Sequence, residues 1–396
     1  MIKAMAEIHD NLNQPGLANR YSGRVVWLYF ADHLQHPFIT LAAETLQAAG
    51  FAVTVVDRSA GKETTAYEHV SLGPPPAPRA SRAWFRPLSA VKHMPVLFSA
   101  FIQVLRKKPS IIIFTLPQFG IIAWIASRLL RARLVYYPFE LFGEQHVKVN
   151  PIQKSIEKKI LRRAIDALIT QNEERGEVYV KERGARVKPT IVHNYKPCYR
   201  PVATGKLRAI LELPDDCRIV LYEGQLMQGR WLDNLIRSSR FLPDNSVLVF
   251  MGRKLPWWDE VAEPLLADPE LAVRVRVMSH VPHAELLDYV ADADVGVIIY
   301  DDKVRNNYLC APGKLSDYIL AGVPVICPDF PTIGPTIRRY AIGAVFTNPD
   351  TETIANAINE VLSRPKTAWQ TALERSSRDL IWETQIPALL NAIAGR

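Results

Sequence analysis

Strand-length runs of apolar residues alternate with helical patterns along the whole of this 396-residue chain. In the first half such runs occupy residues 25–30, 51–57, 111–115, 133–139 and 167–170. In the second half they occupy residues 219–222, 246–251, 273–278, 295–300 and 323–327. Runs this continuous, placed between helices, are typical of parallel strands that are buried on both faces. The sequence therefore predicts an α/β fold that contains doubly wound parallel sheets.

The helical patterns group these runs into two successive arrays. Helices are expected at residues 37–49, up to about 130, at 152–164, 232–241, 283–291, 315–321 and 352–363. Between the arrays, the segment His193–Lys206 has the composition of a linker. We therefore expect a loose tail at residues 1–20, an N-terminal Rossmann-like domain at 21–198 and a C-terminal one at 199–377, the two facing a cleft.

Several classes of protein are excluded by what the sequence lacks. The four cysteines have neither metal-ligand nor disulfide-framework spacing, which fits a reducing compartment. No glycine-rich dinucleotide fingerprint follows the first strand, and there is no Walker motif or nucleophile elbow. The adjacent pair Asp301-Asp302 would point to opposite faces of a strand, so we do not expect a metal site there.

An uncharged segment, Ser110–Ser127, approaches the length of a membrane span. A Pro-Gln-Phe-Gly sequence interrupts it at residues 117–120, so we interpret it as a buried strand, a turn and a helix rather than a transmembrane helix. The N-terminus has no apolar signal region, which predicts a cytoplasmic protein.

The charge of the chain is concentrated in its first half. Residues 1–198 contain 27 Lys and Arg against 15 Asp and Glu, a net of +12, whereas the remainder has 21 against 25, a net of −4. No acidic residue lies between Glu68 and Glu140. Such a field attracts anions, which include phospholipid headgroups, a lipid-phosphate acceptor and nucleic acid, and a merely solvated basic surface is the plain alternative. We predict contact with an anionic membrane surface; the first part of the stretch contributes Arg79, Arg82, Trp84, Phe85, Arg86 and Lys92.

A series of motifs in the second half resembles, in order, those of one enzyme family. They are YEGQLMQGRWLDNLI (Tyr222–Ile236), VLVFMGRK (Val247–Lys254), the segment Ser279–Tyr300, YLCAPGKLSDYILAGVPVICPD (Tyr308–Asp329) and Ile342–Leu362. The chain is similar in these motifs to GT-B glycosyltransferases of the large retaining family 4 type. In the first half, His36-Pro37, VYYPFEL (Val135–Leu141) and Lys154–Glu174 resemble the same family more thinly.

This resemblance implies two Rossmann-like domains and a nucleotide-sugar donor held by the C-terminal one, with no divalent metal or other cofactor. It also implies that residues 378–396 form a helix that crosses back to the N-terminal domain. Four positions depart from the family pattern: Phe139 replaces a cleft histidine, Leu309 and Asp317 stand at the paired-glutamate positions, and Gln225 replaces an arginine.

Two cations at turn–helix junctions are candidates for binding the diphosphate. Arg230 follows Gly229 and precedes a helix, and Lys314 follows Pro312-Gly313 in the same way. A helix N-terminus with a nearby cation favours phosphate, and stabilises a leaving group that gains charge. The alternatives are an exposed arginine at a helix start and a plain surface lysine.

Further residues are assigned to the donor and the acceptor. Asp317, one turn after Lys314, can accept the ribose hydroxyls or can pair with Lys314 within the helix. The resemblance adds donor contacts from Gly224, Gln225, Arg253, His280 and Val281. At the strand ends of the N-terminal domain, His36 and Glu140 are candidates to orient or deprotonate the acceptor hydroxyl, with His33 as the rival of His36.

Together these features predict a metal-independent, hexosyltransferase-like enzyme of polysaccharide biosynthesis. It would transfer a sugar from a UDP- or GDP-type donor to a hydroxyl of a glycan or lipid-linked acceptor, with retention, at the cytoplasmic face of a membrane; a nucleic-acid partner is not expected. Two alternatives remain: a GT-B fold UDP-sugar epimerase, which would need paired carboxylates, and a non-catalytic nucleotide-sugar-binding partner of a larger assembly.

Overall fold

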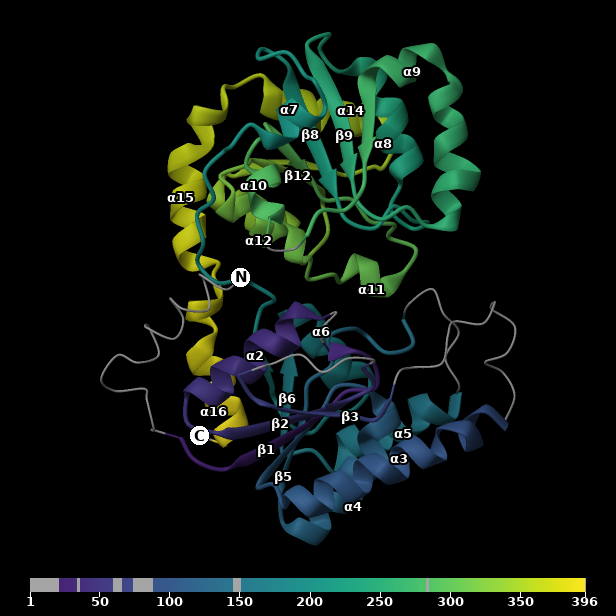
Figure 1. Ribbon diagram of the computed structural model, residues 1–396, viewed down its shortest axis with the longest axis vertical. Helices are drawn as coiled ribbons and strands as arrows, with labels where there is room; N and C mark the ends of the chain where they lie inside the picture. The colour runs from purple at the N-terminus through teal and green to yellow at the C-terminus, as the bar shows by residue number, and fades with distance from the viewer. Residues whose placement is uncertain are drawn as a thin grey trace. The chain divides into compact units, whose positions relative to one another are not determined.

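The computed structural model describes residues 21–33, 36–59, 66–73, 88–144, 151–282 and 285–395. Contacts divide the chain into an N-terminal unit, residues 6–193 with 385–396, and a C-terminal unit that contains residues 194–384. Each unit has one parallel sheet with helices packed against it (Figure 1). The expected tail at residues 1–20 and the residues Arg79, Arg82, Trp84, Phe85 and Arg86 lie outside the described part of the chain.

The sheet of the N-terminal unit has seven strands in the order β3-β2-β1-β4-β5-β6-β7. They are β1 (Arg24–Leu28), β2 (Ala52–Asp57), β3 (Glu68–Ser71), β4 (Ile111–Phe114), β5 (Arg133–Tyr136), β6 (Ala167–Thr170) and β7 (Pro189–Ile191). The five strands predicted from the sequence are present. The edge strands β3 and β7 were not predicted, because they are short and their residues are only partly buried.

Helices cover this sheet, and three of them pack side by side: α3 (Leu88–Lys107), α4 (Pro117–Leu130) and α5 (Pro151–Arg163) (Figure 1). The other main helices are α2 (Pro37–Ala48) and α6 (Glu173–Glu177). The uncharged segment 110–127 forms β4 and most of α4, as predicted, but residues 117–120 begin the helix rather than form a turn. Among the described helices, none has the length and apolarity that a membrane span requires.

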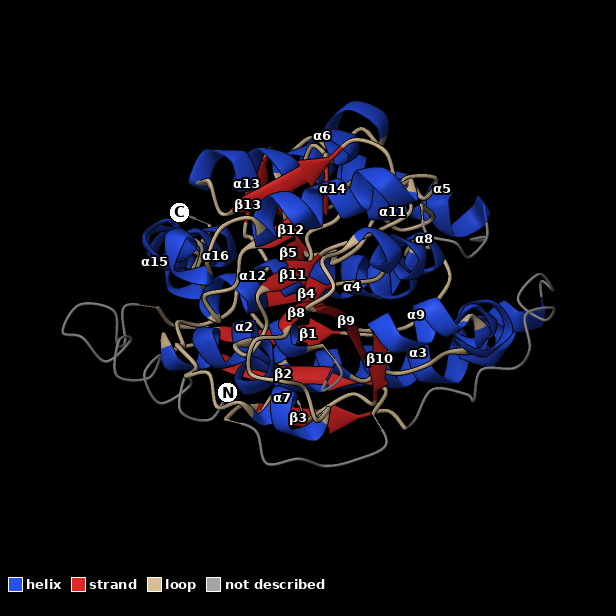
Figure 2. Ribbon diagram, turned by 90° about the horizontal axis from the view of Figure 1, so that it is seen from above, coloured by secondary structure: helices blue, strands red, loops and turns tan. Residues whose placement is uncertain are grey.

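The sheet of the C-terminal unit has six strands in the order β10-β9-β8-β11-β12-β13. They are β8 (Arg218–Glu223), β9 (Ser246–Met251), β10 (Val275–Met278), β11 (Val295–Val297), β12 (Val325–Pro328) and β13 (Gly343–Phe346). The helices are α7 (Lys206–Ile210), α8 (Leu232–Ser238), α9 (Pro269–Arg274), α10 (Leu286–Val290), α11 (Arg305–Tyr308), α12 (Gly313–Leu320), α13 (Gly334–Tyr340), α14 (Thr351–Leu362) and α15 (Gln370–Asp379). Strands and helices alternate along the chain in this unit. Figure 2 shows the strands in red and the helices in blue. The helix expected at 283–291 is shorter, and its first two residues lie outside the described part.

Strand order reverses once in each sheet, between β1 and β4 and between β8 and β11. At such a switch point the loops that follow the two central strands diverge to opposite sides of the sheet. This leaves a crevice at the carboxyl ends of the strands, where open α/β sheets bind their ligands. The fold therefore offers one binding position in each unit.

The last helix, α16 (Ile386–Ala394), belongs to the N-terminal unit and packs on β6 and β7. Leu389 and Ile393 are fully buried, Tyr21 donates a hydrogen bond to Asn391, and Arg133 donates one to the Ala392 carbonyl. The chain returns to the N-terminal unit at residue 385, whereas the family resemblance predicted that it would return at residue 378. Residues up to Thr384 remain in the C-terminal unit because Trp382 is buried and its N–H donates to the Lys196 carbonyl at 2.9 Å.

The boundary between the units also differs from the expected 198/199, since residues 194–198 are part of the C-terminal unit. The Asn194 side chain donates to the Ala311 carbonyl, and the Cys198 N–H donates to the Glu383 carboxylate. The first residues of the expected linker are thus tied to the C-terminal unit by hydrogen bonds.

Candidate active site

The carboxyl end of β8 is shaped by two glycines. Gly224 has a φ of +123°, and a Cβ added there would lie 2.7 Å from Lys314 Nζ. A Cβ on Gly252, at the end of β9, would lie only 1.7 Å from the Gly224 carbonyl oxygen. Glycine at both positions therefore allows the two strand ends and the Lys314 ammonium to approach closely.

Lys314 is the second residue of α12, and its ammonium lies over aromatic rings. Nζ is 4.0 Å from the ring centre of Tyr222 and 5.8 Å from that of Tyr300. This nitrogen is enclosed and makes no hydrogen bond with any described residue. Burial lowers the pKa of Lys314, but Tyr222, Tyr300 and Glu223 outweigh that effect and raise it. The result is a fixed positive charge with unused hydrogen-bonding capacity.

Arg230 is brought to the same place from the loop between β8 and α8. Its guanidinium carbon lies 4.1 Å from the centre of the Tyr300 ring, the ring that Lys314 also approaches. The loop is fixed because the Gly229 carbonyl accepts hydrogen bonds from the Asp301 N–H at 2.9 Å and from Asn307. The two cations singled out from the sequence are thus neighbours on either side of the switch point between β8 and β11.

Asp317 is 3% exposed, and its carboxylate forms an ion pair with Lys196. Lys196 belongs to the segment expected to be a linker, so this partner was not predicted. Of the two sequence-based alternatives, pairing with Lys314 within the helix is wrong, because in the described part of the chain the ion-pair partner of Asp317 is Lys196. The proposed contact of Asp317 with a ribose stays a prediction.

Glu223, the last residue of β8, is a site residue that the sequence analysis missed. It is 6% exposed, and its Oε1 atom makes no hydrogen bond within the described structure. Burial raises the pKa of Glu223, while the nearby Lys314 opposes the shift. A charged residue at the end of an otherwise apolar strand, IVLYE, was the signal that could have identified it.

The remaining predicted donor residues lie along the same edge of the sheet. Gln225, Arg253 and His280 follow β8, β9 and β10 and are exposed, whereas Val281 is half-buried. Backbone contacts fix part of this edge: the Gln225 carbonyl accepts from Tyr222 Oη at 3.1 Å, and the Arg253 carbonyl accepts from the Leu226 N–H at 2.9 Å. Pro312 and Gly313 form the start of α12, as expected.

In the N-terminal unit, His36 is the residue before α2 and packs edge-on against Tyr29, with ring centres 5.2 Å apart. Desolvation lowers the pKa of His36, and the charges of Glu140 and Asp32 partly oppose this. Glu140 is exposed in the loop after β5, and its carbonyl accepts a hydrogen bond from Tyr179. The two candidates are therefore electrostatic neighbours.

Phe139 fills the position of the histidine expected from the family pattern. Its ring is stacked on Trp27, with centres 6.4 Å apart and planes inclined by 14°, and it also contacts the Tyr137 ring. Its carbonyl accepts a hydrogen bond of 2.6 Å from Arg175. An aromatic ring therefore precedes Glu140 at the position where the family pattern has a titratable imidazole.

His33, the rival of His36, is completely buried in a hydrogen-bonded network. Its Nδ1 is 2.7 Å from the Asp57 carboxylate and its Nε2 is 2.7 Å from Tyr67 Oη, while His69 Nε2 is 2.8 Å from the other Asp57 oxygen. Despite its burial, these hydrogen bonds lower the pKa of Asp57 to about 2. Such spacings are those of hydrogen bonds, and are shorter than ligands around one metal ion require. We therefore assign the network a supporting role.

Comparisons with known proteins agree with this architecture. Residues 35–195 match the model of a family described as "Glycosyl transferase 4-like domain". The match covers most of the N-terminal unit. No match was found among curated proteins.

Solved structures extend the likeness to the whole chain. Sucrose-phosphate synthase from Thermosynechococcus elongatus is 19% identical, with a TM-score of 0.75 over 93% of this chain and 97% of that one. HepE from Anabaena in complex with UDP is 15% identical, with a TM-score of 0.72 over 94% and 100%. A structure described as trehalose-6-phosphate from E. coli bound with UDP-2-fluoro glucose is 10% identical, with a TM-score of 0.69 over 94% and 99%. At these identities the likeness establishes the fold, and that fold is GT-B.

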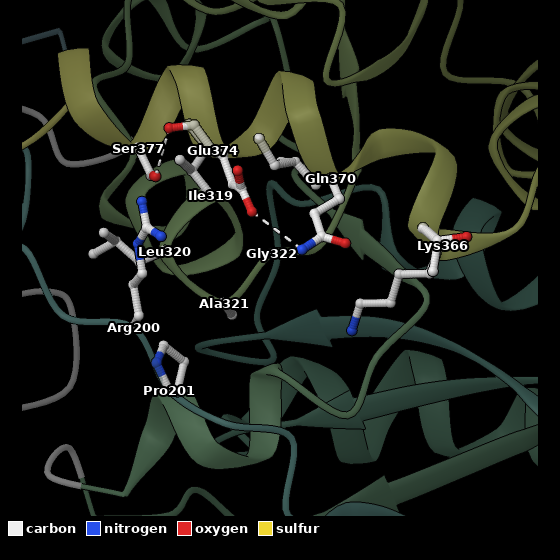
Figure 3. A pocket seen from close by; sticks show the side chains of 12 residues that line it. Arg200, Pro201, Ile319, Leu320, Ala321, Gly322, Lys366, Gln370, Glu374 and Ser377 are labelled. Atoms are coloured by element: carbon white, nitrogen blue, oxygen red, sulfur yellow. Dashed lines mark hydrogen bonds between the residues drawn. The ribbon is translucent and has the colours of Figure 1, made fainter.

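Within the GT-B fold, one cavity of about 370 Å³ lies away from the two cations, between the end of α12 and α15. In Figure 3, Arg200 and Pro201 line one side of it, and Gln370 and Glu374 reach in from α15. None of the predicted donor residues lines this cavity. The ammonium of Lys366, at its edge, is already bonded to the Ala291 carbonyl.

Proposed function

We propose that this protein is a glycosyltransferase that transfers a sugar from a nucleoside-diphosphate sugar to a hydroxyl acceptor, with retention. One observation carries the proposal: the Lys314 ammonium is enclosed at a switch point, beside Arg230, without a hydrogen bond from the described chain. Burying a cation in this way costs free energy unless a ligand completes its contacts. The diphosphate of a sugar donor is an anion of the right charge.

The chemistry follows from charge development on the donor. As the glycosidic bond breaks, the β-phosphate gains negative charge, so cations fixed beside it stabilise the transition state more than the bound donor. Lys314 and Arg230 supply two such charges, and the N-terminus of α12 adds backbone N–H donors. In this proposal these groups take the place that a divalent metal has in other transferases.

The other site residues recognise the rest of the two substrates. Asp317 would accept the ribose hydroxyls, while Gln225, Arg253, His280 and Val281 would contact the nucleoside along the sheet edge. His36 and Glu140 would orient the acceptor hydroxyl. The complexes of HepE with UDP and with UDP-glucose favour UDP over GDP as the nucleotide.

A thermal-shift panel of UDP- and GDP-sugars tests donor binding. A ligand that binds only the folded state stabilises it by RT ln(1 + L/Kd), where L is the ligand concentration, so the melting temperature rises as the ligand concentration increases relative to Kd. Product analysis with the best donor then separates the candidates. Transfer to a hydroxyl supports the proposal, whereas an epimerised sugar nucleotide, or binding without turnover, would support the two alternatives instead.

We further propose that the acceptor is presented at an anionic membrane surface. On the adjacent helices α3 and α4, Phe98 and Leu129 are each 65% exposed, and Met94, Ile121 and Ile125 are also exposed. Exposed basic residues accompany them: Arg106, Lys108, Arg128 and Arg131. Apolar side chains with a basic rim fit the interface of an anionic bilayer, where each basic residue contributes about 1 kcal/mol.

Flotation with vesicles tests this surface. Binding to vesicles that contain anionic lipid, lost at high salt and weakened in a Phe98→Ser, Leu129→Ser double variant, would support it. Replacement of Ile210 and Val202, which are exposed residues of the C-terminal unit, by serine is the matched control. Equal recovery with neutral and anionic vesicles would contradict the proposal.

A further inference from the structure

Five charged or ionisable side chains surround the end of β8. Lys314 and Asp317 come from α12, Arg230 from the β8–α8 loop, Lys196 from the start of the C-terminal unit, and Glu223 from β8 itself. Each of the other four influences the protonation of Glu223. The group therefore acts as one electrostatic cluster.

Only part of this cluster is internally paired. Lys196 and Asp317 form an ion pair, which neutralises both. Lys314 and Glu223, by contrast, form no ion pair within 4.0 Å with the described residues, and Glu223 Oε1 and Lys314 Nζ both make no hydrogen bond there. A buried ammonium and a buried carboxyl group that do not bond to each other can both bind a third partner.

The charges identify the state of Glu223 that suits a donor. With both carboxyl groups ionised, three cations and two carboxylates give a net charge of +1; with Glu223 neutral, the net charge is +2. The diphosphate of a sugar donor carries a charge of −2. An ionised Glu223 would repel it, whereas a neutral carboxylic acid can donate a hydrogen bond to a phosphate oxygen.

Resting on the proposed function, we propose that Glu223 is a donor-site residue that binds the diphosphate as the neutral acid, so that donor binding takes up one proton. Burial raises the pKa of this carboxyl, while Lys314, Lys196 and Arg230 oppose the shift. A bound phosphate raises it further. Affinity is then constant below the pKa of the free protein and falls above it, by up to about tenfold per pH unit.

The neighbouring groups do not supply the same pH dependence. Tyr222, Tyr300 and Glu223 raise the pKa of Lys314, so its ammonium stays charged near neutral pH, and burial raises the pKa of Tyr300 and Tyr318 above their ordinary values. Asp317 forms its ion pair with Lys196. The exposed His280 is a further ionisable residue assigned to the donor edge of this unit. It must therefore be tested separately.

The experiment is calorimetric titration of the full chain with UDP-glucose, and with GDP-mannose in parallel, from about pH 5.5 to about pH 8.5. A sugar nucleotide is used because free UDP has a terminal phosphate that itself titrates at about pH 6. Buffers of different ionisation enthalpy report the number of protons taken up. For the wild type, we expect uptake approaching one proton above the pKa of Glu223 and a Kd that rises with pH.

The variant Glu223→Gln, which imitates the neutral acid, should bind with a Kd that is independent of pH and close to the wild-type value at low pH. Glu360→Gln, the same change at an exposed position of the same unit, should keep the wild-type dependence. Loss of the dependence in His280→Gln but not in Glu223→Gln would overturn the inference, as would at least tenfold weaker binding of Glu223→Gln at every pH. Failure of the wild type to bind either sugar nucleotide would overturn the proposed function itself, and this inference with it.

Discussion

Both sheets end in buried polar groups, but the two sets are satisfied very differently. In the N-terminal unit, Asp57 accepts hydrogen bonds from both His33 and His69 and from the backbone and side chain of Ser59. In the C-terminal unit, the Lys314 ammonium and one oxygen of Glu223 make none with described residues. The first set is complete in the isolated protein, and the second is not.

This difference separates a supporting network from a binding site. A buried polar group without a hydrogen bond costs about 1–3 kcal/mol, so a fold retains it only where another interaction compensates. The Asp57 network needs no ligand, and its removal should act on stability. The Lys314 cluster is incomplete without one, and its removal should act on catalysis.

The largest effect is expected from the two cations. Lys314→Ala and Arg230→Ala should each lower kcat by about 10²–10³, because each contact strengthens as the diphosphate gains charge. Their melting temperatures should stay near the wild-type value, since neither change removes a packed core residue. Arg237→Ala, at an exposed position of α8, is the control. Normal turnover of both variants at saturating donor would remove these residues from the mechanism.

Asp57→Asn tests the other side of the comparison. The loss of a carboxylate held by two imidazoles should lower the free energy of unfolding by about 2 kcal/mol, with the donor Kd unchanged. Denaturant unfolding and nucleotide titration of the same variant provide the two measurements. A weakened donor Kd without loss of stability would reverse the assignment of the two clusters.

Lowering the pH should remove the contribution that Asp57 makes to the free energy of unfolding. Because the folded-state pKa of Asp57 is about 2, below the unfolded value of about 3.9, its contribution is fully present above pH 4 and is lost as the pH falls towards 2. At about 1.36 kcal/mol per pKa unit, this shift corresponds to about 2.5 kcal/mol. The difference in unfolding free energy between wild type and Asp57→Asn should therefore shrink over that interval. A difference that is constant down to pH 2 would show that the charge of Asp57 is not what stabilises the unit.

The smallest effect is expected at Asp317. The ribose does not change during the reaction, so Asp317→Ala should weaken donor affinity by about tenfold and leave kcat within about twofold. Steady-state kinetics with varied donor distinguish the two parameters. If kcat falls while KM stays constant, Asp317 contributes to the chemical step or to the position of Lys314, and the ribose assignment is wrong.

The sequence predicted those features that depend on local pattern. The central strands follow from continuous apolar runs, and the meeting of Arg230 with Lys314 follows from two similar turn–helix junctions at one sheet edge. The edge strands β3 and β7 were not predicted because a short strand that is only partly buried has no continuous run of apolar residues. Lys196 and Glu223 were not predicted because their roles depend on tertiary contacts. Lys196 lies in a segment with the composition of a linker. Glu223 is enclosed only when α12 packs beside β8.

The placement of α16 has a consequence for how the protein is made. Most of the N-terminal unit precedes the C-terminal unit in the chain, yet Leu389 and Ile393 belong to its buried interior, close to β6 and β7. During synthesis these residues leave the ribosome only after the whole C-terminal unit has been translated. The part of the protein that is made first is therefore completed last, and until then the apolar surface that α16 covers is open to chaperones or to misassembly.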